Sequence, residues 1–135
     1  MPGQTPRHPD GAFDELRGAV HDGMSTAELA RTDAWLAGWQ CFETGFYWEA
    51  HELWEPVWMA APPNSAEAQL LRGVIALANA GLKRRMGRDR AAARLDRAAE
   101  AFLTDAMQRG AAMGLDAARL RSMQAQVRRE SIDAI

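Results

Sequence analysis

The 135-residue chain has little of what defines several large classes of protein. Its one cysteine, Cys41, cannot form a disulfide within the chain. No apolar run approaches the roughly 18 residues that a membrane-spanning helix needs. The N-terminal stretch MPGQTPRHPDG also lacks the apolar core of a secretory signal. We therefore expect a cytoplasmic protein that does not bind membranes.

A strong charge of either sign is missing as well. The formal net charge is -2 and the sequence pI is about 5.9, so nothing draws the whole molecule to nucleic acid. The one basic concentration, KRRMGRDR at 83–90, contains an aspartate and no aromatic side chain that could stack on a base. The chain has no glycine-rich phosphate loop either. We predict that nucleic acid is not a partner.

Sustained alternation of apolar and polar residues, the pattern of a half-buried strand, is absent from the chain. The sequence therefore predicts an all-α protein, a compact irregular array of about five helices. Residues 1–24, with Pro2, Pro6 and Pro9, are expected to form an irregular tail, in which FDELRGAV at 13–20 forms at most a marginal helical turn or two. Residues 25–135 are expected to form a single helical domain.

Turn and capping residues place the expected helices. They span 25–44, 46–60, about 65–86, 89–109 and 116–131. Ser25 with Glu28 has the spacing of a capping box, and Asn64 with Glu67 suggests the start of the third helix. Pro56 predicts a kink in the second helix.

Apolar spacing predicts which faces of these helices are buried. The third helix, about 65–86, is almost entirely small and apolar, so we expect it to be central. Aromatic residues repeat along one face of the first helix, and the fourth helix has its own stripe. The expected core residues are Trp35, Trp39, Phe42 and Phe46, and then Leu95, Ala99, Phe102 and Ala106.

The stretch GFYWEAHELWEPVW at 45–58 concentrates three Glu, one His and three Trp. On a helix, His51 and Glu55 are i, i+4 neighbours beside the apolar arc. Glu49 and Glu52 lie further round, and one interpretation leaves Glu49 in solvent. Trp58 closes the stretch as an apolar wall.

The third helix carries Arg72, Asn79 and Lys83 on one narrow face, at i, i+7 and i+11. A buried cation needs an anionic partner. A short turn joins this helix to the Glu-rich one, so the two should pack antiparallel. We therefore predict an ion pair between Glu52 or Glu55 and Arg72 or Lys83.

This polar cluster has three interpretations. It is an architectural network of charges, a site for a small polar ligand or a partner segment, or the centre of a small hydrolase-type enzyme. The catalytic candidates are His51, Glu52 and Glu55. The ligand-binding candidates are Glu49, His51, Glu52, Glu55, Trp58, Arg72, Asn79 and Lys83. The partner's identity and homo-oligomerisation stay open.

Metal ligation was tested against the same residues. HELWE at 51–55 begins like the zinc motif H-E-x-x-H, but Glu55 stands where the second histidine should be. The other histidines, His8 and His21, lie in the predicted tail, so we predict no bound metal and no cofactor. Cys41 lies inside a helix between aromatic residues and is expected to be a buried structural thiol.

Several of these stretches together resemble the bacterial and archaeal family called domain of unknown function 309. They are GFYWEAHELWEPVW at 45–58, APPNS at 61–65, RGVIALANAGLKRRMGR at 72–88 and, more faintly, GQTPRHPDGAFDEL at 3–16. The resemblance implies a small, irregular helical fold and carries no established reaction, cofactor or substrate. Glu49, His51, Glu52, Glu55 and Trp58 match its motif. Ala76 stands where the family commonly has Gln.

Overall fold

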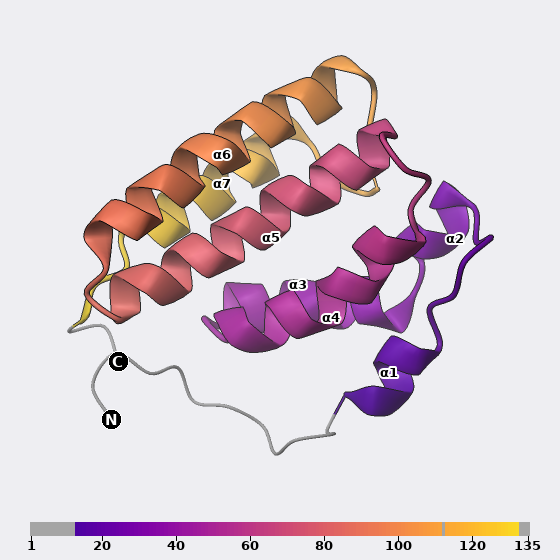
Figure 1. The fold of residues 1–135 in the computed structure, drawn as a ribbon, viewed down its shortest axis with the longest axis horizontal. Helices are drawn as coiled ribbons and strands as arrows, with labels where there is room; N and C mark the ends of the chain where they lie inside the picture. The colour runs from indigo at the N-terminus through magenta and orange to yellow at the C-terminus, as the bar shows by residue number, and fades with distance from the viewer. Residues whose placement is uncertain (1–12, 112, 133–135) are drawn as a thin grey trace.

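The computed structural model describes residues 13–111 and 113–132 of the chain. Within these ranges the only regular elements are seven helices, which confirms the all-α prediction and corrects the expected count of about five. They are α1 (Asp14–Gly18), α2 (Thr26–Ala30), α3 (Asp33–Glu43), α4 (Tyr47–Ala60), α5 (Ala66–Arg85), α6 (Asp89–Gln108) and α7 (Ala117–Arg128). The helices α4, α5 and α6 form a front layer, with α3 and α7 behind it (Figure 1).

The expected first helix is in fact two helices. Ser25 caps α2 as predicted, accepting a hydrogen bond from the Glu28 backbone while the Glu28 side chain accepts one from the Ser25 backbone. The Thr32 hydroxyl ends this helix by donating to the Leu29 carbonyl, and it starts α3 by accepting from the Trp35 amide. One side chain therefore satisfies backbone groups of both helices, which makes the break stable.

The segment expected to be an irregular tail contains the short helix α1. This helix contacts α3 and α4, and Arg17 Nη2 lies 3.7 Å from Glu52 Oε2. Residues 1–12, including His8 and most of the faint N-terminal resemblance, are outside the described residues. The predicted boundary at residue 24 therefore stays a prediction.

The helices α4 and α5 pack together and run in opposite directions (Figure 1). Pro56 lies inside α4 without ending it. The turn before α5 uses Asn64 in the left-handed region, at φ 61°, and Ser65 as the N-cap that accepts from the Ala68 amide. The predicted cap at Asn64 was therefore one residue early, because Asn64 provides the turn conformation instead.

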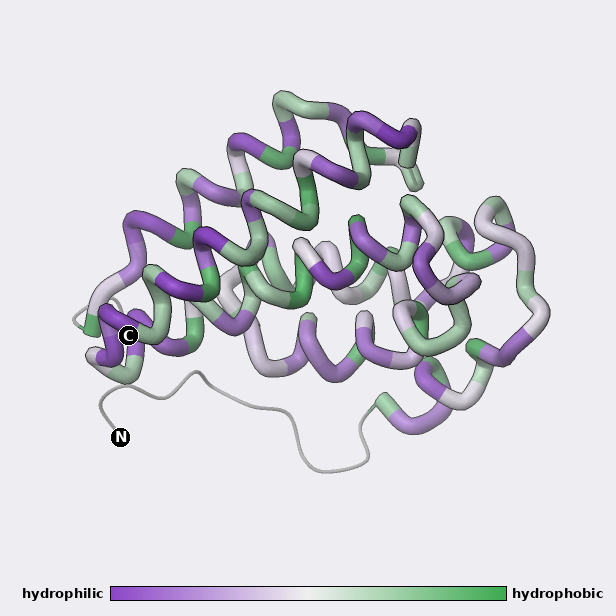
Figure 2. The backbone as a smooth tube through the Cα atoms, turned by 45° about the horizontal axis from the view of Figure 1, so that its top comes forward, coloured by the Kyte–Doolittle hydropathy of each residue, from purple (hydrophilic) through white to green (hydrophobic). Residues whose placement is uncertain are grey.

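Helix α5 contacts α4, α6 and α7. Two of its glycines allow close approach: a Cβ on Gly73 would lie 2.5 Å from a methyl carbon of Leu103, and one on Gly81 would lie 2.6 Å from the Tyr47 ring. In Figure 2 the α5 and α6 tubes alternate between hydrophilic and hydrophobic colours, as expected of helices with one apolar side. No helix in the described part of the chain is both long and apolar enough to cross a membrane.

An aromatic cluster fills the space between α3 and α4. Trp35, Trp39 and Phe42 are buried as predicted, while Phe46 is half-buried. Trp54 completes the cluster, with its ring centroid 5.0 Å from that of Trp39, and its indole N–H donates to the Trp35 carbonyl at 3.1 Å. The buried indole therefore keeps its hydrogen bond.

A polar network joins the C-terminal ends of α5 and α7 to the start of α4. Arg85 pairs with Glu130, donates to the Gly45 carbonyl and lies over the Tyr47 ring at 4.7 Å. Gln126 Nε2 donates to the Tyr47 hydroxyl at 3.1 Å. Burial raises the pKa of Tyr47 to about 12, so the phenol stays neutral at physiological pH.

Candidate functional site

The outward face of the front layer is hollowed along α5, between α4 and α6. One hollow of about 260 Å³ is lined by Glu55, Trp58, Arg72, Ile75, Ala76, Asn79, Leu95 and Phe102. A second, of about 390 Å³, shares Trp58 and Arg72 and extends to Met59, Ala61 and Pro63. We call the two hollows together the α5 groove. It combines four of the predicted site residues: Glu55, Trp58, Arg72 and Asn79.

Arg72 lies between the two hollows and is exposed. Its guanidinium carbon is 4.9 Å from the ring centroid of Phe102 and 5.9 Å from that of Trp58. Its one hydrogen bond among the described residues is a long contact of 3.5 Å to the Gln69 side chain. Most of its five N–H donors therefore face solvent.

The predicted ion pair between α4 and α5 is wrong. Within residues 13–111 and 113–132, neither Arg72 nor Lys83 pairs with Glu52 or Glu55. Arg72 avoids the cost of desolvation because it lies on aromatic faces and keeps the edge of the guanidinium in water. The α4–α5 contact instead includes the close approach of Gly81 to the Tyr47 ring.

On α4, Glu55 lines the first hollow, and His51 contacts Glu55 without lining either hollow. His51 Nε2 lies 3.1 Å from Glu55 Oε2, and the His51 ring lies 5.6 Å from that of Trp48. His51 Nδ1 is buried and has no hydrogen-bond partner in the described structure. The dyad provides a carboxylate beside an imidazole, at a position that a ligand in the groove could contact through Glu55.

The other two glutamates of the motif do not line the groove. Glu52 pairs with Arg17 of α1. Glu49 is only 2% exposed, so the interpretation that left it in solvent is wrong. Its charge acts on Cys41, since burial and then Glu49 raise the pKa of that thiol. Both carboxylates therefore belong to the contacts of α4 with its neighbours.

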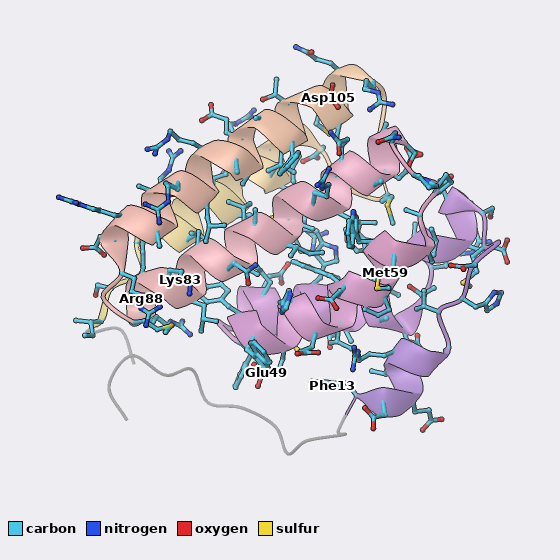
Figure 3. All side chains as sticks on the ribbon, viewed as in Figure 1. Phe13, Glu49, Met59, Lys83, Arg88 and Asp105 are labelled. Carbon is cyan, nitrogen blue, oxygen red and sulfur yellow. The ribbon has the colours of Figure 1, made fainter. Side chains whose placement is uncertain are left out.

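Asn79 and Lys83 continue the predicted stripe of α5. Asn79 is half-buried in the floor of the first hollow. Lys83 is half-buried in the last turn of α5, beyond the hollow and close to the α5–α6 turn (Figure 3). Its ammonium group forms no ion pair with any described residue. The stripe therefore has a cation at each end.

Three apolar lining residues were not recognised as part of the site from the sequence. Ile75 lies in the helix that was expected to be apolar and central, and Leu95 and Phe102 were expected in the core stripe of the fourth helix. Ala99 and Ala106 of that stripe are buried, whereas Leu95 and Phe102 are half-buried walls of the groove. The size of Leu95 and Phe102 was the sequence feature that distinguished them from the alanines of the stripe, because larger side chains extend past the contact between helices that the alanines form.

No group of three or more His, Cys, Asp or Glu side chains that could hold an ion occurs among the described residues. The α5 groove instead contains a guanidinium with available donors, a carboxylate, an amide and apolar walls. Such a set suits the recognition of a charged, partly apolar group.

Residues 35–95 match the family described as "Domain of unknown function (DUF309)". The match includes all of α4 and α5 and most of α3, and therefore most of the groove lining. It confirms the family resemblance seen in the sequence. No match was found among curated proteins or among solved structures.

Proposed function

We propose that this chain, whose residues 35–95 belong to the domain of unknown function 309 family, is a binding module whose α5 groove takes a carboxylate-bearing ligand. The observation that carries the proposal is the state of Arg72. It is an exposed guanidinium braced by Phe102 and Trp58, with no ion pair among the described residues. A planar fork of this kind binds a carboxylate through two parallel hydrogen bonds.

The rest of the lining supports an amphipathic ligand. The first hollow has apolar walls from Trp58, Ile75, Leu95 and Phe102. Asn79 and Glu55 add an amide and a carboxylate to its lining. A ligand with an acidic group, an apolar body and a hydrogen-bond donor would satisfy all three. Because Arg72 is held by two rings, little side-chain entropy is lost when it binds.

The test is a thermal-shift series with small aryl-alkyl carboxylates and their matched primary amides. A ligand that binds only the folded state raises the unfolding temperature by mass action. The carboxylates should stabilise the wild type, whereas the amides should not. Arg72→Gln should weaken carboxylate binding about tenfold, which corresponds to roughly 1.4 kcal/mol.

Arg128→Gln provides the matched control, because it removes the same charge from an exposed position on α7. It should leave carboxylate binding unchanged. Equal stabilisation by acids and amides, or equal loss of binding in both variants, would contradict the proposal. The wild type should also bind less tightly at high salt, since the pair with Arg72 is partly exposed.

A second candidate function is acid–base catalysis of the hydrolase type at the edge of the groove. The observation that favours it is the 3.1 Å contact between His51 Nε2 and Glu55 Oε2. In this arrangement Glu55 would orient the imidazole and His51 would move the proton. Glu52, the other catalytic candidate, is paired with Arg17 and would act only through the packing of α4.

A panel of ester, amide and phosphoester substrates tests the catalytic candidate. Turnover that falls at least about a hundredfold in His51→Gln would support it, because general acid–base catalysis contributes on that scale. The Glu52→Gln variant should keep most of the turnover. Turnover that does not depend on His51 would exclude this dyad as its source.

A further inference from the structure

The α5 groove is the open side of a helical layer. Helix α3 covers the inner face of α4, and α7 covers the inner faces of α5 and α6. No described helix covers the outer face of α5 (Figure 1). Large apolar side chains of α4 line the groove beside it, with Trp58 36% exposed and Met59 66% exposed. A layer of this composition is the usual surface for one more helix.

The charges along α5 give a spacing. Arg72 and Lys83 are eleven residues apart on one face of the helix, so they are about 16 Å apart along its axis. Neither forms an ion pair with a described residue. Between them the face presents Ile75, Ala76 and Asn79, which are half-buried or buried. This face of α5 therefore has a cation at each end and, between the two cations, an apolar floor with one amide.

From this pattern we infer the identity of the occupant, resting on the proposed function: the α5 groove binds an amphipathic helix of a partner protein. That helix carries two acidic side chains eleven residues apart, one for Arg72 and one for Lys83. A helix laid along α5 repeats its side chains with the same period, so this spacing returns both acids to one face. Its apolar residues at the fourth and seventh positions after the first acid meet the floor and the walls.

Glu55 refines the expected sequence of the partner. It is the one carboxylate of the first hollow, and it faces His51 across 3.1 Å. An acidic residue placed opposite Glu55 would be repelled. The partner helix should therefore have a neutral or donor side chain, such as Gln or Lys, in the middle of its acidic pair.

The test is a selection from a displayed library of helical peptides. All members share one helical scaffold, and only the residues on one face of the helix are randomised. The full chain is the bait, and the double variant Arg72→Gln/Lys83→Gln is the counter-bait. Selected peptides should carry two acidic residues eleven apart with apolar residues between them. They should bind the double variant at least about tenfold more weakly. The double variant Arg128→Gln/Arg129→Gln, with the same loss of charge at the C-terminal end of α7, should bind like the wild type.

Peptides that bind without an acidic pair at this spacing, or equally to all three proteins, would overturn the inference. A library that yields no binder, alongside small carboxylates that do bind through Arg72, would overturn it and leave the proposed function standing. If the small carboxylates also fail, both fall. Self-association of the chain that is lost in Arg72→Gln would identify a second copy as the occupant and would likewise overturn it.

Discussion

Arg72 shows how an exposed cation can be fixed in place without an ion pair. Because it leaves no buried carboxylate behind, Arg72→Ala should lower the free energy of unfolding by only about 0.5–1 kcal/mol, the contribution of cation–aromatic contacts at exposed sites. Urea denaturation measures this. A loss near 3 kcal/mol would instead indicate a buried pair. Arg72→Met, which keeps the apolar stem, should lose less than Arg72→Ala.

Tyr47 offers a direct reading of the buried polar network, because it is the one tyrosine in the chain. Its pKa is raised to about 12 from an ordinary value of 10.0, chiefly by burial. Phenolate absorbance should therefore titrate near 12 in the folded protein and near 10 in concentrated urea. Since the folded-state pKa is the higher one, the neutral phenol stabilises the fold fully below pH 10. That contribution is lost as the pH rises toward 12.

The Tyr47→Phe variant should show no phenolate signal and a smaller loss of stability in the same alkaline range. A folded wild type that titrates near pH 10 would contradict the burial of this hydroxyl.

At the scale of single side chains, the sequence predicted positions better than partners. Helical periodicity predicted that Arg72 and Asn79 share one face of α5, and both line the first hollow together with Glu55 and Trp58. The predicted partner of Arg72 was wrong. Periodicity predicts the direction in which a side chain points, but not which side chains from distant parts of the sequence contact it. Phe102, thirty positions along the chain, is the nearer aromatic contact of its guanidinium.

Among the helices, α5 depends on its small residues for contact with α4. Gly81→Ala should destabilise the fold by about 2 kcal/mol, because the added methyl would lie 2.6 Å from the Tyr47 ring. That ring is 1% exposed and cannot turn aside. Chemical denaturation provides the measurement.

Gly18→Ala is the control for this substitution. Nothing lies within 4 Å of the added methyl in α1, so the better helix propensity of alanine should leave stability unchanged or raise it by up to about 1 kcal/mol. If both variants behave alike, helix propensity rather than contact with Tyr47 governs α5.

The boundaries of elements were predictable where the signal is local. The capping box of Ser25 and Glu28 and the spans of α6 and α7 followed from neighbouring residues in the sequence. The break between α2 and α3 did not, because Thr32 has no sequence spacing that distinguishes an N-cap from an ordinary helical threonine. The burial of Glu49 was not predictable either, since it depends on which elements cover that side of α4.

For the molecule as a whole, composition and hydrophobic periodicity were sufficient to predict the fold class but not the arrangement of the helices in layers. The absence of strand patterns correctly predicted the all-α structure of the described residues, and residues 35–95 match the model of the family that the sequence resembles. The uncovered outer face of α5 could not be foreseen, because an apolar stripe predicts burial without saying whether the covering helix belongs to the same chain. At the α5 groove, no described helix of the chain covers the apolar side chains.

The pairing of α5 with α6 also has a consequence for how the chain reaches this structure. The two longest helices are neighbours in sequence, joined by the short turn at 86–88, so their mutual contacts close only small loops. Contacts of this kind form early, because little chain entropy is lost before they are made. Leu103→Ala, which opens space beside Gly73, should therefore slow refolding, whereas Leu29→Ala in α2 should mainly speed unfolding. In stopped-flow kinetics, these results would place the α5–α6 pair in the folding nucleus, with α2 joining it only after the rate-limiting step.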